Sequence, residues 1–339
     1  MFVNSDNYIK YLKLWLITLF LLIISMVGVG GLTRLTDSGL SITAWELFIG
    51  ILPPLNIEEW NWYFSEYKKI PEFKNINYLM TLNEFKTIFY WEYAHRLLAR
   101  VVGLFSLLPL IFFTLKFKNN KSYSNKYYLI FLLICLQGFI GWYMVSSGLI
   151  ENNDVSHFRL SIHLTLALFI LCLIFWFILD LSNITKFKIK ISNLLLFLIL
   201  ILIVLQIILG AFLSGLDGGL IYNSWPDMNG AFFPNDITAN DYLSSKLFYN
   251  PSIIQFFHRL TAYILLFFII FLNYLFIKKK LNFLNILFFD FVILLQIFLG
   301  IVTLVSGAEI KYASLHQLGS ILVLSSYLLI LYKNVNQQL

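Results

Sequence analysis

Charged residues are scarce in this sequence of 339 residues. Lys, Arg, Asp and Glu together make up 12% of it, whereas hydrophobic residues make up 59% and aromatic residues 18%. The mean hydropathy is +0.79. So few charges exclude an ordinary soluble protein, because about a quarter of the residues in such proteins are charged. The composition therefore predicts an integral membrane protein.

Cysteine is almost absent, with Cys135 and Cys172 as its only occurrences. Both lie inside long apolar segments, so they cannot supply a disulfide or a thiol mechanism in an outer loop. A targeting segment rich in Arg and Ser is also missing, and Lys10 and Lys13 instead precede an apolar run too long for a signal-peptide core. This pattern favours a bacterial plasma (inner) membrane protein that retains its first span.

Long apolar runs are what the sequence has in abundance. A helix needs about 20 mostly apolar residues to cross a bilayer. The chain has eight such runs, at residues 12–32, 95–115, 127–147, 160–180, 193–214, 254–277, 283–305 and 313–332. The predicted fold class is an all-α integral membrane protein with eight transmembrane helices.

Lysines are concentrated in alternate loops between these runs. The loops after the second, fourth and sixth runs contain Lys116, Lys118, Lys121, Lys126, Lys186, Lys188, Lys190, Lys278, Lys279 and Lys280. The positive-inside rule places these loops, and with them both termini, in the cytoplasm. The net charge of +6 is thus largely a topological bias, and we expect no binding to nucleic acid.

The sequence contains an internal repeat. LQGFIGWYMVSSG from Leu136 resembles LQIFLGIVTLVSG from Leu295, and LQIILGAFLSG from Leu205 resembles MVGVGGLTRLTDSG from Met26. The repeat unit is four helices long, which predicts domains at residues 1–185 and 186–339. Because four is an even number, we expect two parallel four-helix bundles related by a pseudo-twofold axis along the membrane normal.

Four of the five histidines occupy equivalent places in the repeat. Each lies just inside the outer start of an even-numbered apolar run, and they are His95, His163, His258 and His316. Ionisable groups in membrane spans are costly and usually functional, and pairs of imidazoles in a helical bundle suit the axial ligation of haem. We expect one haem site at His95 and His163 and a second at His258 and His316, both near the outer face. His157 has no counterpart and is interpreted as a loop residue or a neighbour of a ligand.

Glycines recur in the odd-numbered runs at a fixed distance from glutamines. The pairs are Gln137 and Gly141, Gln206 and Gly210, and Gln296 and Gly300, with Gly30 and Gly31 at the matching place in the first run. Glycine there allows close approach of another helix or of a flat ligand. Helix packing is the favoured interpretation, and these glycines are not assigned to the site.

The residues beside the histidines make the two halves unequal. Glu92 precedes His95 by three residues, where the second half has Gln255 before His258. Arg96 and Arg259 each follow a histidine directly. A guanidinium group near the outer interface is suited to pair with a haem propionate.

Five segments carry a family resemblance. They are GVGGLTRLTDSGLSITAWELFIGILPPLN from Gly28, WEYAHRLLARVVG from Trp91, IYNSWPDMNGAFFP from Ile221, FHRLTAYIL from Phe257 and LHQLGSILVL from Leu315. In this order, and across nearly the whole chain, they resemble the haem A synthase family. The resemblance implies an eight-helix oxidoreductase that converts the ring methyl of haem O, by successive hydroxylations, to the formyl group of the haem A used by cytochrome oxidase.

The resemblance also implies roles for individual residues. His258 and His316 would hold a haem b cofactor, His95 and His163 would lie at the substrate haem, and Glu92 would move protons or orient water. The partners implied are haem O, a haem O synthase, membrane lipid and an electron donor that the sequence does not identify. Some relatives carry a cysteine pair in the first outer loop, so this chain resembles a subtype that works without one.

Two other functions use the same features. A di-haem b membrane electron carrier would need the same four histidines but two equivalent sites, which the exchange of Glu92 for Gln255 disfavours. A secondary transporter would need polar groups near mid-membrane and interrupted helices, whereas the ionisable residues here gather at the outer end. The synthase is favoured, and the carrier is the alternative.

The lysine pattern gives a prediction about topology. Single cysteines introduced near Lys121, Lys188 and Lys279, in a background with Cys135 and Cys172 replaced by serine, should be protected from an impermeant thiol reagent in intact cells. A cysteine near Asp236 should react, because its loop is predicted to face outward. The opposite labelling pattern would rule out a site at the outer face.

Overall fold

The chain forms helices of two kinds, long apolar ones and short polar ones. The computed structural model describes residues 5–45, 49–116, 121–150, 153–182, 184–185, 187, 190–238, 241, 245–281 and 283–335. Within these ranges no β-strand occurs, and the one β-bridge joins Met228 to Ala231. Lys118, Lys186 and Lys188, which were used to predict the topology, lie outside the described residues.

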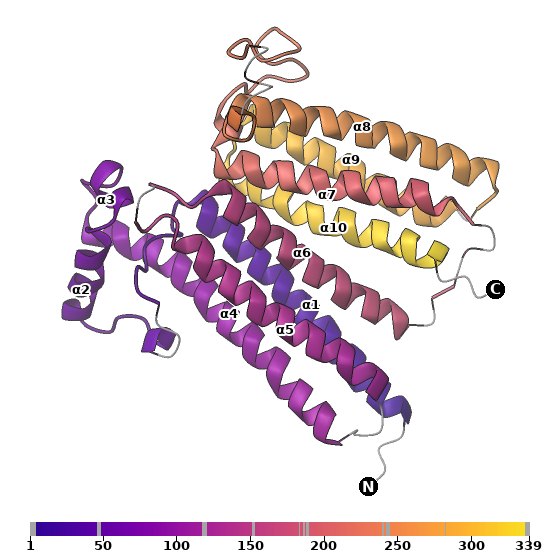
Figure 1. The fold of residues 1–339 in the computed structure, drawn as a ribbon, viewed down its shortest axis with the longest axis horizontal. Coiled ribbons are helices and arrows are strands. Elements are labelled where there is room, and N and C mark those ends of the chain that lie inside the picture. The colour runs from indigo at the N-terminus through magenta and orange to yellow at the C-terminus, as the bar shows by residue number, and fades with distance from the viewer. Residues whose placement is uncertain are drawn as a thin grey trace. The chain divides into compact units, whose positions relative to one another are not determined.

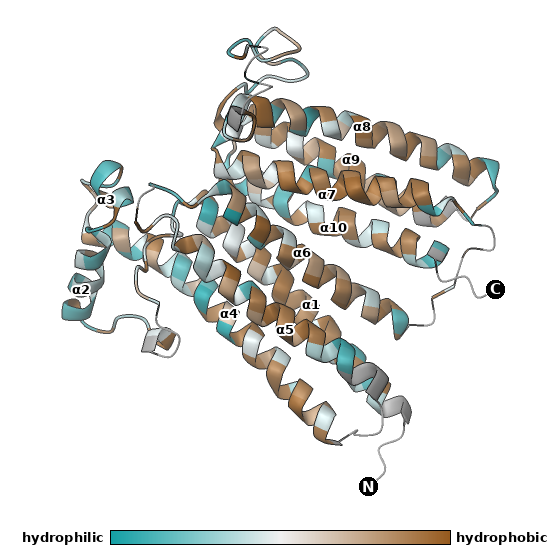
Figure 2. Cartoon of the chain, in the orientation of Figure 1, coloured by the Kyte–Doolittle hydropathy of each residue, from teal (hydrophilic) through white to brown (hydrophobic). Residues whose placement is uncertain are grey.

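Eight of the described helices are long and apolar enough to cross a membrane. They are α1 (Ser5–Leu35), α4 (Leu82–Lys116), α5 (Lys121–Val145), α6 (His157–Asp180), α7 (Asn193–Gly215), α8 (Pro251–Lys278), α9 (Phe283–Val305) and α10 (Ile310–Val335). Each overlaps one of the eight predicted segments, which confirms the fold class (Figure 1). Their surfaces are mainly apolar over most of their lengths (Figure 2).

Two compact units make up the chain, one from Met1 to Ile174 and the other from Phe175 to Leu339. The repeat predicted a boundary farther along, between residues 185 and 186. The compact boundary falls inside α6, so the last turns of this helix pack with the second unit. Trp176, for example, makes an edge-to-face contact with Tyr332 of α10 at 5.0 Å between ring centroids.

In the first unit, α4 packs against both α1 and α5. The indole Nε1 of Trp15 on α1 donates a hydrogen bond to the carbonyl oxygen of Phe105 on α4 at 2.9 Å. The same indole packs edge-to-face on Tyr127 of α5 at 5.4 Å. Trp15 therefore joins the three helices, and its polar atom is paired inside an apolar contact, as a membrane interior requires.

Helix α4 begins much earlier than the apolar run predicted. It starts at Leu82 rather than near residue 95, and its 35 residues extend over about 52 Å at 1.5 Å per residue. A capping box explains the start, because the Oε2 atom of Glu84 accepts hydrogen bonds from the backbone N–H and the hydroxyl of Thr81 at 2.7 and 2.8 Å. The sequence TLNE from Thr81 to Glu84 could have predicted this start of the helix. About 30 Å would cross the bilayer core, so α4 is long enough to reach well beyond it.

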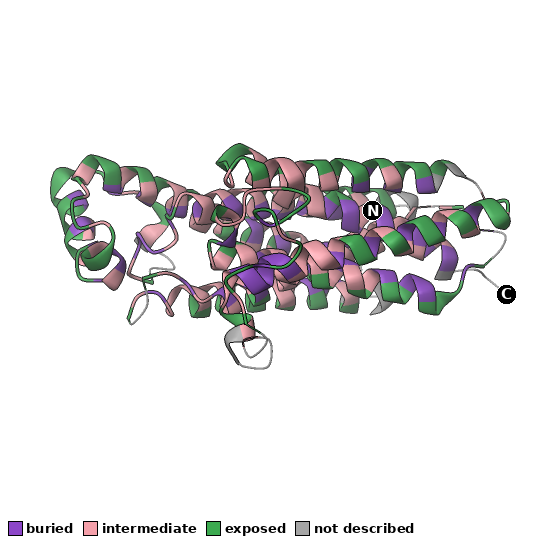
Figure 3. Ribbon diagram, turned by 90° about the horizontal axis from the view of Figure 1, so that it is seen from above, coloured by how far each residue is buried: buried purple, intermediate pink, exposed green. Residues whose placement is uncertain are grey.

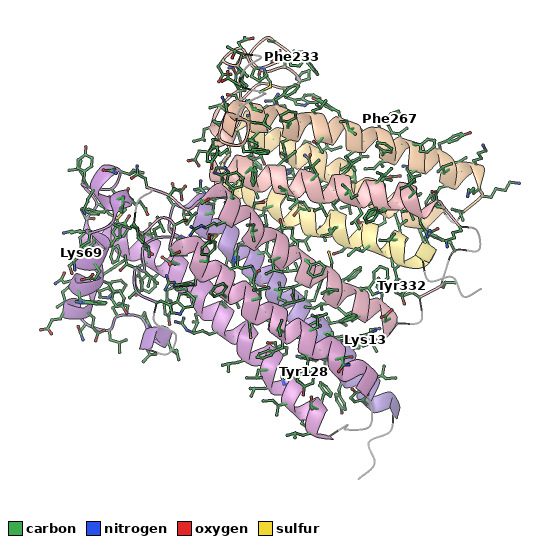
Figure 4. The ribbon with its side chains drawn as sticks, in the orientation of Figure 1. Lys13, Lys69, Tyr128, Phe233, Phe267 and Tyr332 are labelled. Carbon is green, nitrogen blue, oxygen red and sulfur yellow. The ribbon has the colours of Figure 1, made fainter. Side chains whose placement is uncertain are left out.

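Helix α2 (Ile57–Tyr67) packs on this extension of α4, and the short helix α3 (Pro71–Asn75) packs on α2 through Phe73. The ring of Phe64 stacks on Phe85 at 5.0 Å, and Trp60 contacts Phe89 edge-to-face at the same distance. Aromatic side chains from the segment between α1 and α4 thus hold the start of α4 in a small core of its own. Lys69, at the outer surface of this part (Figure 4), pairs with Glu66 instead of joining that core.

This small core contains a buried acid, Glu72. The hydroxyl of Tyr67 donates to the Oε1 atom of Glu72 at 3.0 Å, and the amide of Asn77 donates to the same oxygen at 3.2 Å. Burial raises the pKa of Glu72 to about 8, against the hydrogen bond from Tyr67, which lowers it. Burial also raises the pKa of the Tyr67 hydroxyl. Near neutral pH this cluster is therefore a set of largely uncharged, mutually hydrogen-bonded groups.

The second unit is a bundle in which α7 contacts α8 and α10, and α9 contacts α8 and α10. Its polar contacts lie near the helix ends. The Tyr327 hydroxyl donates to the carbonyl oxygen of Leu196, and Asn334 exchanges two hydrogen bonds with the backbone of Ile191 at 2.7 and 3.1 Å. Asn273 of α8 donates to the carboxylate of Asp290 on α9 at 2.9 Å.

Large apolar side chains are exposed along the outer faces of both units (Figure 3). Phe267, on the outside of α8 (Figure 4), is 66% exposed, and Leu104 on α4 is 58% exposed. In water such surfaces would be costly, whereas lipid tails are as apolar as these side chains. The exposed residues are thus explained by the same membrane that the composition predicts.

Candidate functional site

The four repeat histidines lie on the even-numbered spans, each within about four turns of the helix start. His95 and His163, on α4 and α6, belong to the first unit, and His258 and His316, on α8 and α10, belong to the second. All four are partly buried. His95 and His163 interact electrostatically, as do His258 and His316. The structure thus brings together the two pairs that the repeat predicted.

Each imidazole packs against a glycine of the preceding membrane span, which is α1, α5, α7 or α9. The glycine and histidine pairs are Gly30 with His95, Gly141 with His163, Gly210 with His258 and Gly300 with His316. A Cβ atom added to the glycine would lie 2.8, 2.9, 3.3 and 2.8 Å, in the same order, from the Cε1 atom of the histidine. Three of these separations are shorter than real Cβ atoms show. We call these four positions the glycine seats.

The sequence left two interpretations of these glycines, close approach of another helix or of a flat ligand, with helix packing favoured. In the structure a neighbouring helix does approach each glycine closely, and the side chain that makes the contact is the imidazole of a predicted ligand. Gly30, rather than Gly31, supplies the seat for His95. The signal that could have found the seats was the constant four-residue spacing from the glutamines, taken together with one histidine for each glycine.

Glutamines one turn before three of the seats reach the histidines. The amide Nε2 of Gln137 donates to the carbonyl oxygen of His163 at 2.9 Å and lies 3.1 Å from its Nδ1. Nε2 of Gln206 lies 3.2 Å from the ring Nε2 of His258. Nε2 of Gln296 donates to the carbonyl oxygen of His316 at 2.9 Å.

The contact at His316 is the most complete of the three. Its Nδ1 lies 3.2 Å from the backbone carbonyl oxygen of Gln296, a geometry in which an N–H at Nδ1 donates and fixes the ring. A Cβ atom at Gly319 would collide with the Gln296 side chain at 2.1 Å, so this second glycine makes room for the amide. Neither these glutamines nor Gly319 were predicted to belong to the site.

Glu92 is buried and binds the loop that follows α1. Its Oε2 atom accepts hydrogen bonds from the Ser41 hydroxyl at 2.7 Å and the Ile42 backbone N–H at 2.8 Å. Its Oε1 atom accepts two from Arg96, from Nε at 2.9 Å and from a terminal nitrogen at 2.6 Å. These four donors occupy about the whole acceptor capacity of a carboxylate. Arg96 also donates to the carbonyl oxygens of Ile42 and Ala44 at 2.6 and 3.0 Å.

The second half repeats this arrangement with an amide. The Nε2 atom of Gln255 donates to the carbonyl oxygens of Gly218 and Ile221 at 2.9 and 2.6 Å, and its Oε1 atom accepts from Arg259 at 3.1 Å. Arg259 donates to loop carbonyls as Arg96 does, with Tyr222 at 2.7 Å as one acceptor. We call the two arrangements the first and second loop clamps.

The loops themselves explain why one clamp has Glu and the other Gln. The first loop presents donors, the Ser41 hydroxyl and the Ile42 N–H, which a carboxylate can accept. The second presents two carbonyl oxygens, at Gly218 and Ile221, which only an amide can satisfy. The exchange of Glu92 for Gln255 between the halves therefore matches the hydrogen-bonding groups that each loop presents.

His157, Arg34 and the two cysteines also lie on the spans but outside the histidine pairs. His157 is buried at the start of α6, with its ring 4.4 Å from that of Phe158, so it is a helix-start residue rather than part of a histidine pair. Arg34, at the end of α1, forms ion pairs with Asp37 and Asp154 at 2.9 and 3.1 Å. Cys135 and Cys172 are both free thiols on spans.

The donor set fits haem better than a bare metal ion. Within the described residues no three His, Cys, Asp or Glu side chains are grouped to hold an ion. Two imidazoles are sufficient where a porphyrin supplies the other ligands. The buried Nδ1 atoms of His95 and His258 have no hydrogen-bond partner among the described residues, as is expected of rings whose orientation depends on a further ligand.

Comparison with known proteins gives a family match over most of the chain. A family model described as "Cytochrome oxidase assembly protein" matches residues 13–328. The protein named Heme A synthase of Pelagibacter ubique is 78% identical over 336 residues, which cover 99% of this chain and 100% of that protein. Proteins of the same name from Rickettsia bellii and Rickettsia felis are 43% and 41% identical, over 93% and 92% of this chain and 96% and 94% of theirs.

The glycine seats give a prediction with a matched control in the same helix. Replacing Gly141 by alanine should displace His163 and lower the haem content of the purified protein, because the added Cβ atom meets the ring at 2.9 Å. Replacing Gly138, one turn earlier, should leave haem content unchanged, because a Cβ atom there meets no atom within 4 Å. Both changes favour the helix itself by up to about 1 kcal/mol. Haem content and the absorption spectrum measure the difference, and equal behaviour of the two variants would contradict the seat assignment.

Proposed function

The chain belongs to the cytochrome oxidase assembly protein family, and we propose that it is a membrane haem A synthase. It is then an oxidoreductase that converts the ring methyl of haem O to the formyl group of haem A. The observation that carries this proposal is the pairing of His95 with His163 and of His258 with His316 beside glycine seats, in a chain 78% identical to a protein named Heme A synthase.

We assign different tasks to the two histidine pairs. His258 and His316, in domain 186–339, hold a haem b cofactor. His95 and His163, in domain 1–185, ligate the iron of the substrate haem. The contact of the His316 Nδ1 atom with the backbone carbonyl oxygen of Gln296 supports this assignment, because a permanent cofactor benefits from a ligand of fixed orientation. The pseudo-twofold relation between the repeats stays a prediction.

The residues of the chain position the reacting groups. Haem, when bound, supplies the iron at which oxygen and electrons become an oxidant strong enough for a methyl group. The glycine seats bring the histidines against the helix backbone, and the loop clamps fix the outer segments that follow α1 and α7. A methyl group held in one orientation beside the oxidant reacts with less loss of entropy in the transition state.

We propose that Glu92, Arg96 and Arg259 also belong to the site. Proton transfer or water orientation by Glu92 would require its carboxylate to exchange one of four donors for water or substrate. Both arginines are proposed to bind the haems through their propionates. The Nε atom of Arg259, buried without a hydrogen-bond partner in the described structure, supports this for the second half.

We propose that the protein lies in the inner (cell) membrane, with both termini in the cytoplasm and the haem sites near the outer face. Eight long apolar helices and the lysine-rich loops support this topology. Its partners are haem O, a haem O synthase that supplies it, lipid, and an electron donor. A di-haem b electron carrier remains the second candidate, favoured only by the equivalent geometry of the four glycine seats.

The two tasks predict different effects of histidine substitution. Replacing His258 or His316 by alanine should remove most of the stable haem B, because an axial ligand of the cofactor is lost. Replacing His95 or His163 should spare that haem and reduce the formation of haem A. Extraction and chromatography of the haems from each purified variant make the comparison. Equal loss of haem B from all four variants would favour the electron carrier.

A nearly isosteric change at Glu92 tests its chemical role. If the carboxylate moves protons or orients water, Glu92→Gln should lower haem O conversion by roughly a hundredfold or more. Haem B content should not change, since the contacts of Glu92 lie within the first unit. Conversion at the wild-type rate would rule out the catalytic assignment.

Ser41→Ala is the control for an effect through the loop. It removes one donor to the Glu92 carboxylate and leaves the charge in place. A catalytic Glu92 predicts at most a few-fold loss of conversion in this variant, about what one hydrogen bond contributes. A loss as large as that of Glu92→Gln would show that Glu92 acts by holding the first outer loop.

A further inference from the structure

Four large aliphatic side chains are exposed in the loop between α1 and α2, outside the membrane spans. They are Ile51, Leu52, Leu55 and Ile57, each at least 47% exposed, in the stretch that leads into the first residue of α2. Exposed apolar residues that gather in this way usually mark contact with a membrane or with another molecule. We call residues 51–57 the apolar segment.

One hydrogen bond fixes the apolar segment to a known level of α4. The hydroxyl of Tyr93 donates to the carbonyl oxygen of Ile51 at 2.6 Å. Counted back from Lys116, the last residue of α4, about 20 residues cover the roughly 30 Å of the hydrocarbon core and end near Arg96. Tyr93 lies three residues farther, about 4 to 5 Å, which is within the headgroup layer. The apolar segment therefore begins at the surface of the bilayer.

Helix α2 then runs along α4 away from the membrane. Trp60 contacts Phe89, and Phe64 stacks on Phe85, which is eight residues and about 12 Å from Tyr93. Beyond Ile57 the exposed side chains of α2 and of the turn after it are polar, one tryptophan excepted: Glu58, Glu59, Asn61, Trp62, Ser65, Lys68 and Lys69. Apolar exposure beside the bilayer and polar exposure farther away are the pattern of a surface partly immersed in lipid.

The backbone of the apolar segment also suits contact with lipid. Pro53 and Pro54 have no N–H to donate. The N–H of Leu55 donates to the Oε2 atom of Glu59 at 2.8 Å, and the carbonyl oxygen of Ile51 is paired with Tyr93. Backbone groups that are paired within the protein lose no hydrogen bond to water when their residues enter an apolar environment.

We propose that the apolar segment inserts into the lipid at the histidine end of the spans, with its four aliphatic side chains at the boundary between headgroups and acyl chains. The segment contains no Lys or Arg, so its apolar surface provides the binding and anionic headgroups are not required. The loop that follows α1 is then held at two places, by the first loop clamp beside His95 and by lipid at residues 51–57. This contact does not depend on haem chemistry.

Spin labels on single cysteines test the insertion in the full-length protein, with Cys135 and Cys172 replaced by serine, in phosphatidylcholine vesicles. Leu55→Cys is compared with Leu79→Cys, a control at a leucine that is 80% exposed. Leu79 precedes the start of α4 at Leu82, and so lies at least about 16 Å farther along this helix than Tyr93. Leu104→Cys, on the apolar surface of α4, marks full immersion.

Collision rates of the labels with oxygen and with a water-soluble nickel chelate give the measurement, because oxygen concentrates in lipid and the chelate in water. The ratio of oxygen to nickel collisions at residue 55 should be severalfold higher than at residue 79 and close to that at residue 104. Equal ratios at residues 55 and 79 would overturn the proposal.

Leu52→Cys covers the case in which Leu55→Cys does not fold, and its label should give the same high ratio. A label at either position that neither reagent reaches would show that a second copy of the chain or another protein covers the segment, which also contradicts the proposal. Adding phosphatidylglycerol should leave the ratio unchanged, because the segment has no basic residue. Immersion that appears only with this anionic lipid would rule out insertion through apolar side chains.

Discussion

Contact between an imidazole and a bare helix backbone is the interaction on which this structure depends. At Gly30, Gly141 and Gly300 a single added carbon would lie less than 3.0 Å from the ring of the facing histidine. Close packing of this kind leaves no room to slide, so each pair of helices is fixed in register wherever its histidine is fixed. The positions of the histidines along the helices thus follow from the helix packing and do not depend on the loops.

Beside the aromatic core around α2, hydrogen bonds from two arginines hold the loops that follow α1 and α7. Arg96 and Arg259 each occupy the centre of a clamp whose acceptors are mainly carbonyl oxygens of these loops. Guanidinium groups can do this because they present several donors in a rigid plane. Near the end of a span such a group stays close to water, and its cost of burial is modest.

The sequence predicted the features that depend on counting residues. Span length, lysine distribution and the four repeat-equivalent histidines each follow from one-dimensional spacing, and the eight helices were confirmed. Features that depend on the direction in which a side chain points were missed. Whether Gly141 faces a helix or an imidazole, and whether Glu92 faces a haem pocket or Ser41, is decided by side-chain orientation across two segments far apart in the chain. The start of α4 was missed because hydropathy outweighed the capping signal at Thr81 and Glu84.

The loop clamps also bear on how a duplicated protein can diverge. A carboxylate in place of Gln255 would meet the carbonyl oxygens of Gly218 and Ile221, and an amide in place of Glu92 would turn its NH2 group either toward the donors at Ser41 and Ile42 or toward those of Arg96. Either exchange leaves buried polar groups facing like groups, which typically costs about 1 to 3 kcal/mol for each. Side chain and loop conformation must therefore have changed together. After that change, a return to the earlier side chain at position 92 or 255 alone would leave it facing loop groups that it cannot pair with, so the two halves could no longer exchange these residues singly.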